Sequence, residues 1–425
     1  MAKTLFTSVQ IIDGSGDEPF AGEVLVEGNR IKKIARDGKR LPRAGARLID
    51  GAGATLMPGL IEPHLHVSFL DLPRIEMLGE VPVEEHTLRT MKNARRMLDQ
   101  GFTAGFSAAA AKPRLDVVIR NAIDAGDIAG PRMRAASPEL TVTGGLGDVR
   151  LLHMERSTFA IVCDGPDEFR RVAREMCREG VDTLKINPSG DEAVPFAKAR
   201  HTVMNEAEIA AVCEVARSRE KRLAAHTRSA ESVKLSLKHG VDVIYHATLV
   251  DEEAKDMLEA AKDRVFVAPT FGLSYATLYE AEAWGISTQA AIDIGLKREL
   301  EIGIENMKDL HRRGVRVLPG GDYGFAWNPI GRNARDLGHF VRLLEFSPME
   351  AIVAATRFGG ELMGMGGELG LVKEGYLADL LLVAGDPLAD IALLQDAGNF
   401  LAIMKDGAFH KAPGTAPARA RVAAE

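Results

Sequence analysis

The chain is poor in several features that mark other classes of protein. It has three cysteines in 425 residues, and none forms a CxxC pair, so neither a disulfide framework nor a thiolate metal site is expected. No apolar run approaches the roughly 18 residues needed to cross a bilayer, and the first residues lack the apolar stretch of a secretory signal. The sequence therefore predicts a cytoplasmic protein without a membrane partner.

An excess of positive charge is also missing. Lys and Arg number 53 against 60 Asp and Glu, which gives a net charge of −7, and no polybasic cluster stands out. This balance argues against a nucleic-acid partner, because such proteins carry a basic patch. Aromatic residues make up only 5%, which weighs against an extended sugar-binding cleft. The remaining composition, 46% hydrophobic and 27% charged, is that of an ordinary globular protein.

Strand-like segments occur near both ends of the chain, at 4–13, 23–27, 30–34, 378–383 and 400–404. Short β modules at opposite ends of a chain each need a partner that buries one face. We therefore expect residues 1–57 and 366–412 to form one composite β-sandwich. The Ala/Pro/Arg-rich residues 413–425 are expected to be a flexible tail.

Between these ends, residues 58–365 repeat one pattern, in which a helical segment stops at a glycine and an apolar segment follows at once. The glycines are Gly101, Gly180, Gly240 and Gly314. Glycine past a helix end adopts the left-handed C-cap, and alternation of helix and apolar strand is typical of a parallel α/β sheet. Strands are expected near residues 61, 103, 132, 182, 222, 242, 265 and 315.

Eight such strands predict an α/β fold of the (β/α)8 TIM-barrel type. The segment from His64 to Asp322 has about the length of such a barrel, roughly 250 residues. A doubly wound open sheet is the alternative fold, but no GxGxxG motif follows a first strand.

Catalytic groups of a barrel lie at the carboxyl ends of its strands. Six polar residues are expected at those ends: His64, His66, Lys185, His226, His246 and Asp322. Residues i and i+2 of a strand point to the same face, so the two histidines of His64-Leu-His66 can bind one cation. Each residue taken alone is a weak signal, and the predicted site depends on their combination.

Lys185 is an unusual residue for the interior of a barrel, because burial of an uncompensated ammonium group is expensive. Three states of Lys185 would avoid this cost: a solvated lysine at the strand tip, a Schiff-base lysine, or a lysine carbamate that bridges metals. Four histidines, an anionic bridge and Asp322 would together hold two divalent cations. Their nitrogen and oxygen atoms suit zinc, with manganese or nickel as alternatives.

The order HxH, Lys, His, His, Asp resembles that of the amidohydrolase superfamily. So do Met-Pro-Gly-Leu-Ile at 57–61 and Glu-Gly-Tyr-Leu-Ala-Asp at 374–379. Within the superfamily, Thr-Val-Thr-Gly-Gly at 141–145 and the pair Lys185-Ile186 resemble the imidazolonepropionase-like branch, which includes Xaa-Pro dipeptidases.

The resemblance implies a binuclear centre in which Lys185 is carboxylated and bridges the metals. Its other implied ligands are His64, His66, His226, His246 and Asp322. The chain departs from its relatives at Glu62, where many have Asp, and from the dipeptidase group at Leu146, where that group has His, and at Thr227-Arg228. These departures weigh against dipeptides as preferred substrates.

The predicted function is a metal-dependent hydrolase that cleaves a C–N bond of a small-molecule amide, urea, carbamate or cyclic amide. A metal-bridging hydroxide would attack, and Asp322 would carry its proton to the leaving nitrogen. The alternatives are an Xaa-Pro type dipeptidase or carboxypeptidase, a mononuclear deaminase, a Schiff-base aldolase and a non-enzymatic assembly protein. A deaminase would carry Glu at position 229, which is Ser, and an assembly protein would have lost ligands.

Substrate selection is expected from loops that follow the strands. Arg228 is a candidate for binding a carboxylate or carbonyl group, and Tyr323 and Trp327 are candidates for a wall around an apolar group. Each of these could instead serve only the packing or charge balance of the protein. A homo-oligomer is expected.

Overall fold

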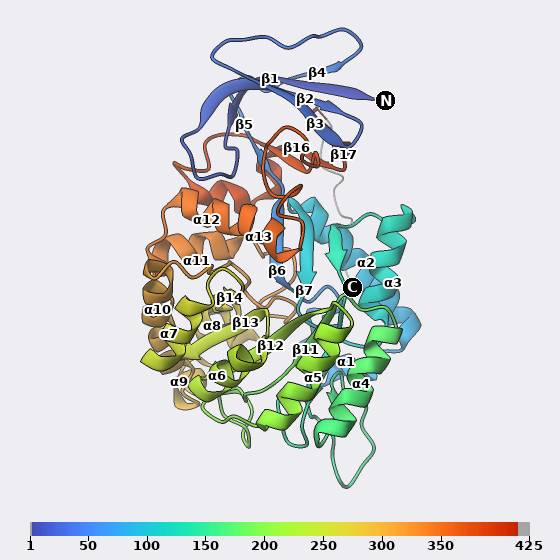
Figure 1. Ribbon diagram of the computed structural model, residues 1–425, viewed down its shortest axis with the longest axis vertical. Helices are drawn as coiled ribbons and strands as arrows, with labels where there is room; N and C mark the ends of the chain where they lie inside the picture. Colours follow the sequence, from blue (N-terminus) through green and yellow to red (C-terminus); the bar gives the residue numbers. More distant parts are fainter. Residues whose placement is uncertain (1, 415–425) are drawn as a thin grey trace.

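The computed structural model describes residues 2–414. Strands from both ends of the chain pair in one sheet, at the top of Figure 1. The strand order of this sheet is β17-β16-β15-β5-β1-β2-β3, with β4 beside β1. The bounds are β1 (Lys3–Ile11), β2 (Phe20–Glu27), β3 (Arg30–Arg36), β4 (Arg47–Asp50), β5 (Thr55–Pro58), β15 (Leu380–Val383), β16 (Phe400–Lys405) and β17 (Ala408–Lys411). The two ends meet where β5 pairs antiparallel with β15.

The expected joining of the two ends is thus present, but the strands follow one hydrogen-bonded path, so a sandwich of two separate sheets is not confirmed. One face of this sheet buries its own apolar cluster, which includes Phe6, Val24, Leu56 and Leu382. The predicted flexible tail, 413–425, lies almost entirely outside the described residues.

The middle of the chain supplies parallel strands at the predicted positions. These are β6 (Leu60–Leu65), β7 (Phe102–Ser107), β8 (Arg132–Arg134), β9 (Ala136–Thr141), β11 (Thr183–Ile186), β12 (Arg222–Ser229), β13 (Val243–Leu249) and β14 (Phe266–Ala268). One sheet has the order β6-β7-β8, and the other has the order β10-β9-β11-β12-β13-β14, where β10 is Ile161–Val162. Only Ala135 separates β8 from β9, so the third strand of the series pairs in both sheets.

The eighth predicted strand is represented by a parallel bridge between Val267 and Val317. Within residues 2–414 no ladder joins this segment to β6, although a Cβ atom added to Gly320 would lie 2.7 Å from the Cβ of His64. The first and eighth segments are therefore in contact without a strand pair. The fold is α/β and resembles a TIM barrel.

Helices surround these strands (Figure 1). They are α1 (Met77–Glu80), α2 (Val83–Asp99), α3 (Leu115–Ala125), α4 (Pro166–Arg178), α5 (Glu206–Ser218), α6 (Ala230–His239), α7 (Glu252–Ala260), α8 (Phe271–Tyr279), α9 (Thr288–Asp293), α10 (Leu296–Arg312), α11 (Arg335–Leu344), α12 (Pro348–Ala355) and α13 (Arg357–Leu362), with short 3-10 turns at Glu282–Trp284, Ile391–Gln395 and Ala397–Asn399. Among the described residues, no helix combines the length and the apolar character that a bilayer span requires.

The glycine pattern of the sequence has the expected structural cause. The φ angles of Gly101, Gly180, Gly240 and Gly314 are 82°, 94°, 93° and 80°, in the left-handed region that favours glycine. They follow α2, α4, α6 and α10, and each directs the chain into the next strand. β6, β7 and β11 are buried along their whole length, as expected for parallel strands that are covered on both faces.

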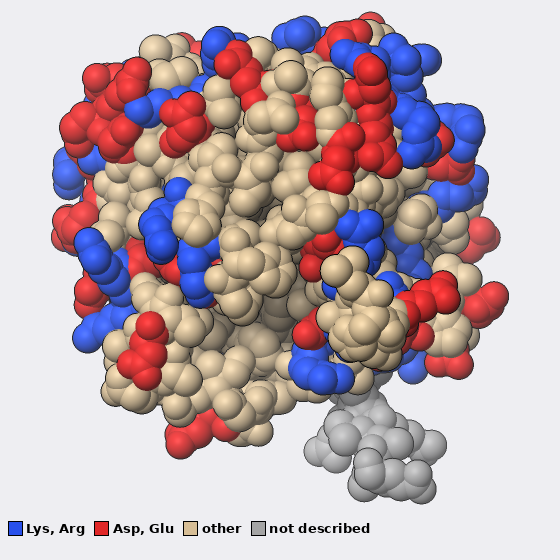
Figure 2. Space-filling model, turned by 90° about the horizontal axis from the view of Figure 1, so that it is seen from below, with Lys and Arg blue, Asp and Glu red and all other residues tan. Residues whose placement is uncertain are grey.

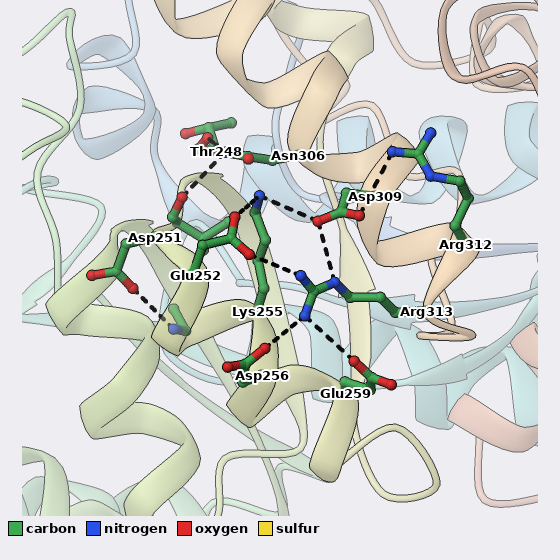
Figure 3. A network of polar contacts seen from close by, with 12 residues as sticks. Thr248, Asp251, Glu252, Lys255, Asp256, Glu259, Asn306, Asp309, Arg312 and Arg313 are labelled. Atoms are coloured by element: carbon green, nitrogen blue, oxygen red, sulfur yellow. Dashed lines mark hydrogen bonds and ion pairs between the residues drawn. The ribbon is translucent and has the colours of Figure 1, made fainter.

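Helix α10 is fixed to its neighbours through its second half (Figure 3). Near its carboxyl end, Arg313 pairs with Asp256 of α7 at 2.7 Å and with Glu252 at 2.9 Å. Toward the middle, the amide of Asn306 donates to the carbonyl of Thr248, at the end of β13, at 2.8 Å. These contacts hold α10 against α7 and the carboxyl end of β13.

Candidate active site

A pocket of about 670 Å³ opens at the carboxyl ends of the central strands, away from the terminal sheet. All six residues that the sequence placed at strand ends line it: His64, His66, Lys185, His226, His246 and Asp322. Figure 2 views the molecule from the end opposite the terminal sheet and shows a hollow in a largely uncharged area. The structure thus brings the predicted residues together, while their role as metal ligands stays a prediction.

Two histidines and Asp322 form the tightest group in this pocket. Their potential ligand atoms lie within 4.8 Å of one another, which makes the group a candidate metal site. Nε2 of His66 lies 3.1 Å from Oδ1 of Asp322, and Nε2 of His64 lies 3.8 Å from it. The alternation of side chains along β6 explains why both histidines face the same side.

The other two histidines stand next to this group. The ring centroids of His226 and His246 are 4.1 Å apart, and the ring of His246 is 5.8 Å from that of His64. His226 and His246 come from β12 and β13, which are adjacent in the sheet. The four imidazoles therefore line one continuous part of the pocket.

Hydrogen bonds fix which ring nitrogen of three histidines is free. Nδ1 of His66 donates to the carbonyl of Ala109 at 3.1 Å, and Nε2 of His226 donates to the carbonyl of Gly190 at 3.1 Å, because a carbonyl can only accept. Nδ1 of His246 donates to the hydroxyl of Thr270, whose own hydrogen goes to the carbonyl of Pro269. Such contacts orient metal-binding imidazoles and leave the opposite nitrogen as an electron-pair donor.

Two buried imidazole nitrogens of the site have no hydrogen-bond partner within residues 2–414. They are Nε2 of His246 and Nδ1 of His64. An orphaned buried polar atom costs roughly 1–3 kcal/mol, so in a folded protein it calls for an explanation such as a bound ion.

Burial controls the protonation of these groups. It lowers the pKa of His226 to about 3, with a further contribution from Arg228, and it takes the pKa values of His64 and His246 well below the usual range. The three rings are thus neutral, which is the form that binds metals. Burial alone would raise the pKa of Asp322, but electrostatic interactions with the neighbouring imidazoles of His64 and His66 hold it below its ordinary value.

Lys185 is inside the protein, with 1% of its surface exposed. This contradicts the interpretation of a solvated lysine at the strand tip. Its Nζ lies 4.8 Å from the ring centre of Tyr245, and no ion pair to it is present among the described residues. Burial lowers its pKa, although the negative charges of Glu139 and Asp322 oppose the shift. A buried, unpaired amine of this kind favours a neutral or chemically modified state.

The backbone is strained at three positions of the site. The φ angles of Asp322, His246 and Thr270 are 58°, 72° and 64°, a left-handed region that residues other than glycine rarely adopt. The amide of Asn328 donates to the carbonyls of Gly321 at 3.0 Å and of Asp322 at 3.1 Å. These bonds hold the segment that carries Asp322 in its unusual conformation.

The two aromatic candidates for the substrate wall differ. Trp327 lines the pocket, and its indole nitrogen donates to the hydroxyl of Thr277 at 2.8 Å. Tyr323 does not line it: the side chain is 1% exposed, and its hydroxyl donates to the buried carboxylate of Asp336 at 3.0 Å. The prediction that Tyr323 binds substrate is therefore corrected, because the turn at Asp322 directs the next side chain into the core.

Arg228 also lines the pocket, but its charge is already balanced. It is 3% exposed, and its guanidinium pairs with Glu299 at 2.6 Å and with Asp191 at 2.8 Å. Burial opposes the charged form, yet these two carboxylates raise the pKa of Arg228 above its ordinary value. The structure thus supports a charge-balancing role for Arg228 in the pocket wall and gives no support to substrate binding.

Replacement of Glu299 by Gln should lower the free energy of unfolding by roughly 1–3 kcal/mol, because Arg228 and Thr248 both donate to this carboxylate in the interior. Urea unfolding of the purified variant measures the effect. Glu175→Gln is the matched control, since its pair with Arg171 is exposed and its loss should change stability by less than about 1 kcal/mol. Equal effects of the two variants would contradict the importance of the buried pair.

Three further residues of the pocket were missed from the sequence. Glu139 lies opposite Lys185 in the pairing of β9 with β11, and Arg156 lies in the loop that follows β9. Asp191 pairs with Arg228 from the loop after β11. Glu139 could have been found from the sequence, because the apolar residues around it extend the predicted third strand to Thr141. No sequence pattern pointed to the loop residues Arg156 and Asp191.

The sequence of the chain matches a known protein family. The profile of the amidohydrolase family matches residues 55–409, which is most of the chain. The chain belongs to the amidohydrolase family. The resemblance noted in the sequence is thereby confirmed, and the protein is an enzyme of this family, a hydrolase that acts on carbon–nitrogen bonds.

Individual amidohydrolases resemble the chain over nearly its whole length. Ochratoxinase from Aspergillus niger is 23% identical over 455 aligned residues, covering 97% of this chain and 88% of that protein. An imidazolonepropionase from Rubrobacter xylanophilus is 23% identical, covering 90% and 89%. The crystal structure of a prolidase in complex with N-methylphosphonate-L-proline has a TM-score of 0.86 and 25% identity, covering 97% and 100%. These relatives agree with the predicted branch of the superfamily.

Proposed function

We propose that the protein is a metal-dependent hydrolase that cleaves the C–N bond of a small-molecule amide, urea, carbamate or cyclic amide. In this proposal residues 58–365 are the catalytic domain, and 1–57 with 366–412 support it. The observation that carries the proposal is the gathering of four histidines, Lys185 and Asp322 in one pocket, with two buried imidazole nitrogens that have no partner among the described residues.

The residues present fit two divalent cations. His64, His66, His226, His246 and Asp322 would hold them, together with a carbamate formed when the amine of Lys185 adds CO2 and loses a proton. Neutral imidazoles and oxygen anions suit zinc. Such cations, when bound, polarise a carbonyl group and make a water molecule acidic enough to attack at neutral pH.

Asp322 has the central role among the chain's own groups. Its carboxylate is anionic, faces the pocket and is held in place by the bonds of Asn328 to the backbone on either side. In the proposed reaction, its oxygen takes the proton of the attacking water and then gives it to the leaving nitrogen, so that one group serves as base and acid.

The wall of the pocket favours an apolar group on the substrate. Phe69, Phe159, Phe325 and Trp327 line it from several loops, and the rings of Phe69 and Phe159 meet edge to face with centroids 6.1 Å apart. Burial of an apolar substrate group against these rings would contribute binding energy in proportion to its area. It would also keep bulk water away from Asp322.

A dipeptidase of the Xaa-Pro type is the second candidate, favoured by the likeness to the prolidase structure. Two features of this chain weigh against it: Leu146 lines the pocket as an apolar residue, and Arg228 has both of its carboxylate partners within the protein. A deaminase is disfavoured because position 229 is Ser, whose hydroxyl caps helix α6.

A hydrolysis screen tests the proposal. N-acyl amino acids, dipeptides, aryl amides, phenylureas and cyclic amides are incubated with the protein in the presence of zinc and bicarbonate, and mass spectrometry identifies the products. We expect cleavage of a C–N bond in a compound with an apolar group. Preference for Xaa-Pro dipeptides would favour the second candidate, and loss of ammonia from a ring amine without any other cleavage would contradict both.

A further inference from the structure

Three arginines line the pocket, and two of them are neutralised within the protein. Arg228 pairs with Glu299 and Asp191, as described above. Arg150 makes a two-point contact with Asp148, with Nε 2.8 Å from Oδ1 and Nη2 3.0 Å from Oδ2. Arg156 lies in the same loop as Arg150, is half-buried, and has neither a hydrogen bond nor an ion pair to any residue between 2 and 414.

The loop of Arg156 is anchored directly after this residue. The hydroxyl of Thr158 donates to the carbonyl of Gly147 at 2.7 Å, and the carbonyl of Ser157 packs against α1, where a Cβ atom added to Gly79 would lie 2.4 Å from it. The unpaired guanidinium is therefore carried by a backbone that is tied to the wall of the pocket. Glu76, which precedes α1, also lines the pocket but lies beyond ion-pair distance from Arg156.

A half-buried arginine without an ion-pair partner can bind an anion that a ligand supplies. A guanidinium that is partly removed from water loses hydration without gaining a counter-charge, so a ligand that supplies the charge binds favourably. Its planar set of N–H groups matches the two oxygens of a carboxylate in a bidentate contact. The two paired arginines cannot offer this contact without losing their own partners.

We propose that Arg156 is a specificity-determining residue that binds a carboxylate of the substrate. Together with the apolar wall, it selects compounds in which the C–N bond lies in a molecule that carries both an apolar group and a free carboxylate. This inference rests on the proposed function for the identity of the bond that is cleaved. The binding role of Arg156 can be tested without turnover.

The test compares two ligands that differ only in charge. The first is a ketone analogue of N-phenylacetyl-leucine in which a methylene group replaces the amide NH, so that no C–N bond is present to cleave. The second is the same ketone with a primary alcohol in place of the carboxylate. Calorimetry measures the Kd of each for the zinc-loaded wild type and for Arg156→Gln, Arg156→Lys and Arg150→Gln.

We expect Arg156→Gln to weaken binding of the carboxylate about 10- to 100-fold and that of the alcohol less than about twofold, because only the former loses charge-assisted hydrogen bonds. Arg156→Lys should retain part of the affinity, since it keeps the charge without the planar geometry. Arg150→Gln, in the same loop, should leave the ratio of the two Kd values within about twofold of the wild type.

Several results would overturn the inference: equal binding of the two ligands by the wild type, no binding of either, or the same loss of selectivity in Arg150→Gln as in Arg156→Gln. The proposed function is judged separately by the hydrolysis screen. If no C–N bond is cleaved but carboxylate binding depends on Arg156, the function is wrong and the binding site stands. If neutral amides are cleaved as well as acids, the function stands and the inference falls.

Discussion

Asp322→Asn should lower kcat about 10²- to 10⁴-fold while the protein keeps most of its bound metal. The amide retains one oxygen that can act as a ligand, and it cannot accept the proton of the attacking water. The bonds that Asn328 makes to the backbone at Gly321 and Asp322 do not involve the changed side chain, so the segment should keep its conformation. Steady-state kinetics and elemental analysis on the same preparation measure the two quantities together.

The outcome separates a catalytic role from a ligand role. Metal retained with nearly normal turnover would remove Asp322 from the mechanism. Loss of metal and activity in equal proportion would limit Asp322 to holding the cations with His64 and His66, its neighbours in the site.

Lys185→Ala should lose bound metal and activity together, because it removes the group that would carry the carbamate. Acetate or propionate added to this variant should restore part of both, since a small carboxylate can occupy the space left by the side chain and supply the missing anion. Reconstitution of metal-free wild type should require bicarbonate, because an unmodified lysine would present a positive charge to two cations.

Lys185→Met is the matched control for this rescue. Methionine fills nearly the same volume and leaves no room for acetate, so neither metal nor activity should return. Its metal-free form should be at least as stable as that of the wild type, because an apolar side chain replaces a buried amine that has no ion-pair partner in the described structure. A Lys185→Ala protein with two metals and normal turnover would contradict the carbamate bridge.

The sequence was sufficient to predict the positions of seven of the eight expected central strands and the meeting of the six candidate residues. Glycines at 101, 180, 240 and 314 identify the helix ends, because each adopts a left-handed conformation there. Parallel strands place their carboxyl ends at one edge of a sheet, so side chains far apart in the chain, such as His66 and Asp322, come within 3.1 Å.

The sequence was not sufficient where contacts depend on distant segments or on local turns. One partner of Arg228 is Glu299, which lies 71 residues further along the chain, and no pattern connects the two. Tyr323 was placed on the pocket wall by its position after Asp322, but the positive φ of Asp322 breaks the alternation of side chains and directs the ring inward. The pairing of β5 with β15 likewise depends on the folded arrangement of both ends.

The metal content of active enzyme tests the central claim most directly. Protein is purified without chelators, its specific activity is measured on a compound from the hydrolysis screen, and elemental analysis gives the number of divalent ions per chain. The account predicts about two ions per chain, with activity that disappears on chelation and returns on addition of zinc and bicarbonate. Full activity in a chain that holds no metal would contradict it, and a reproducible ratio of one in fully active protein would reduce the site to a single ion.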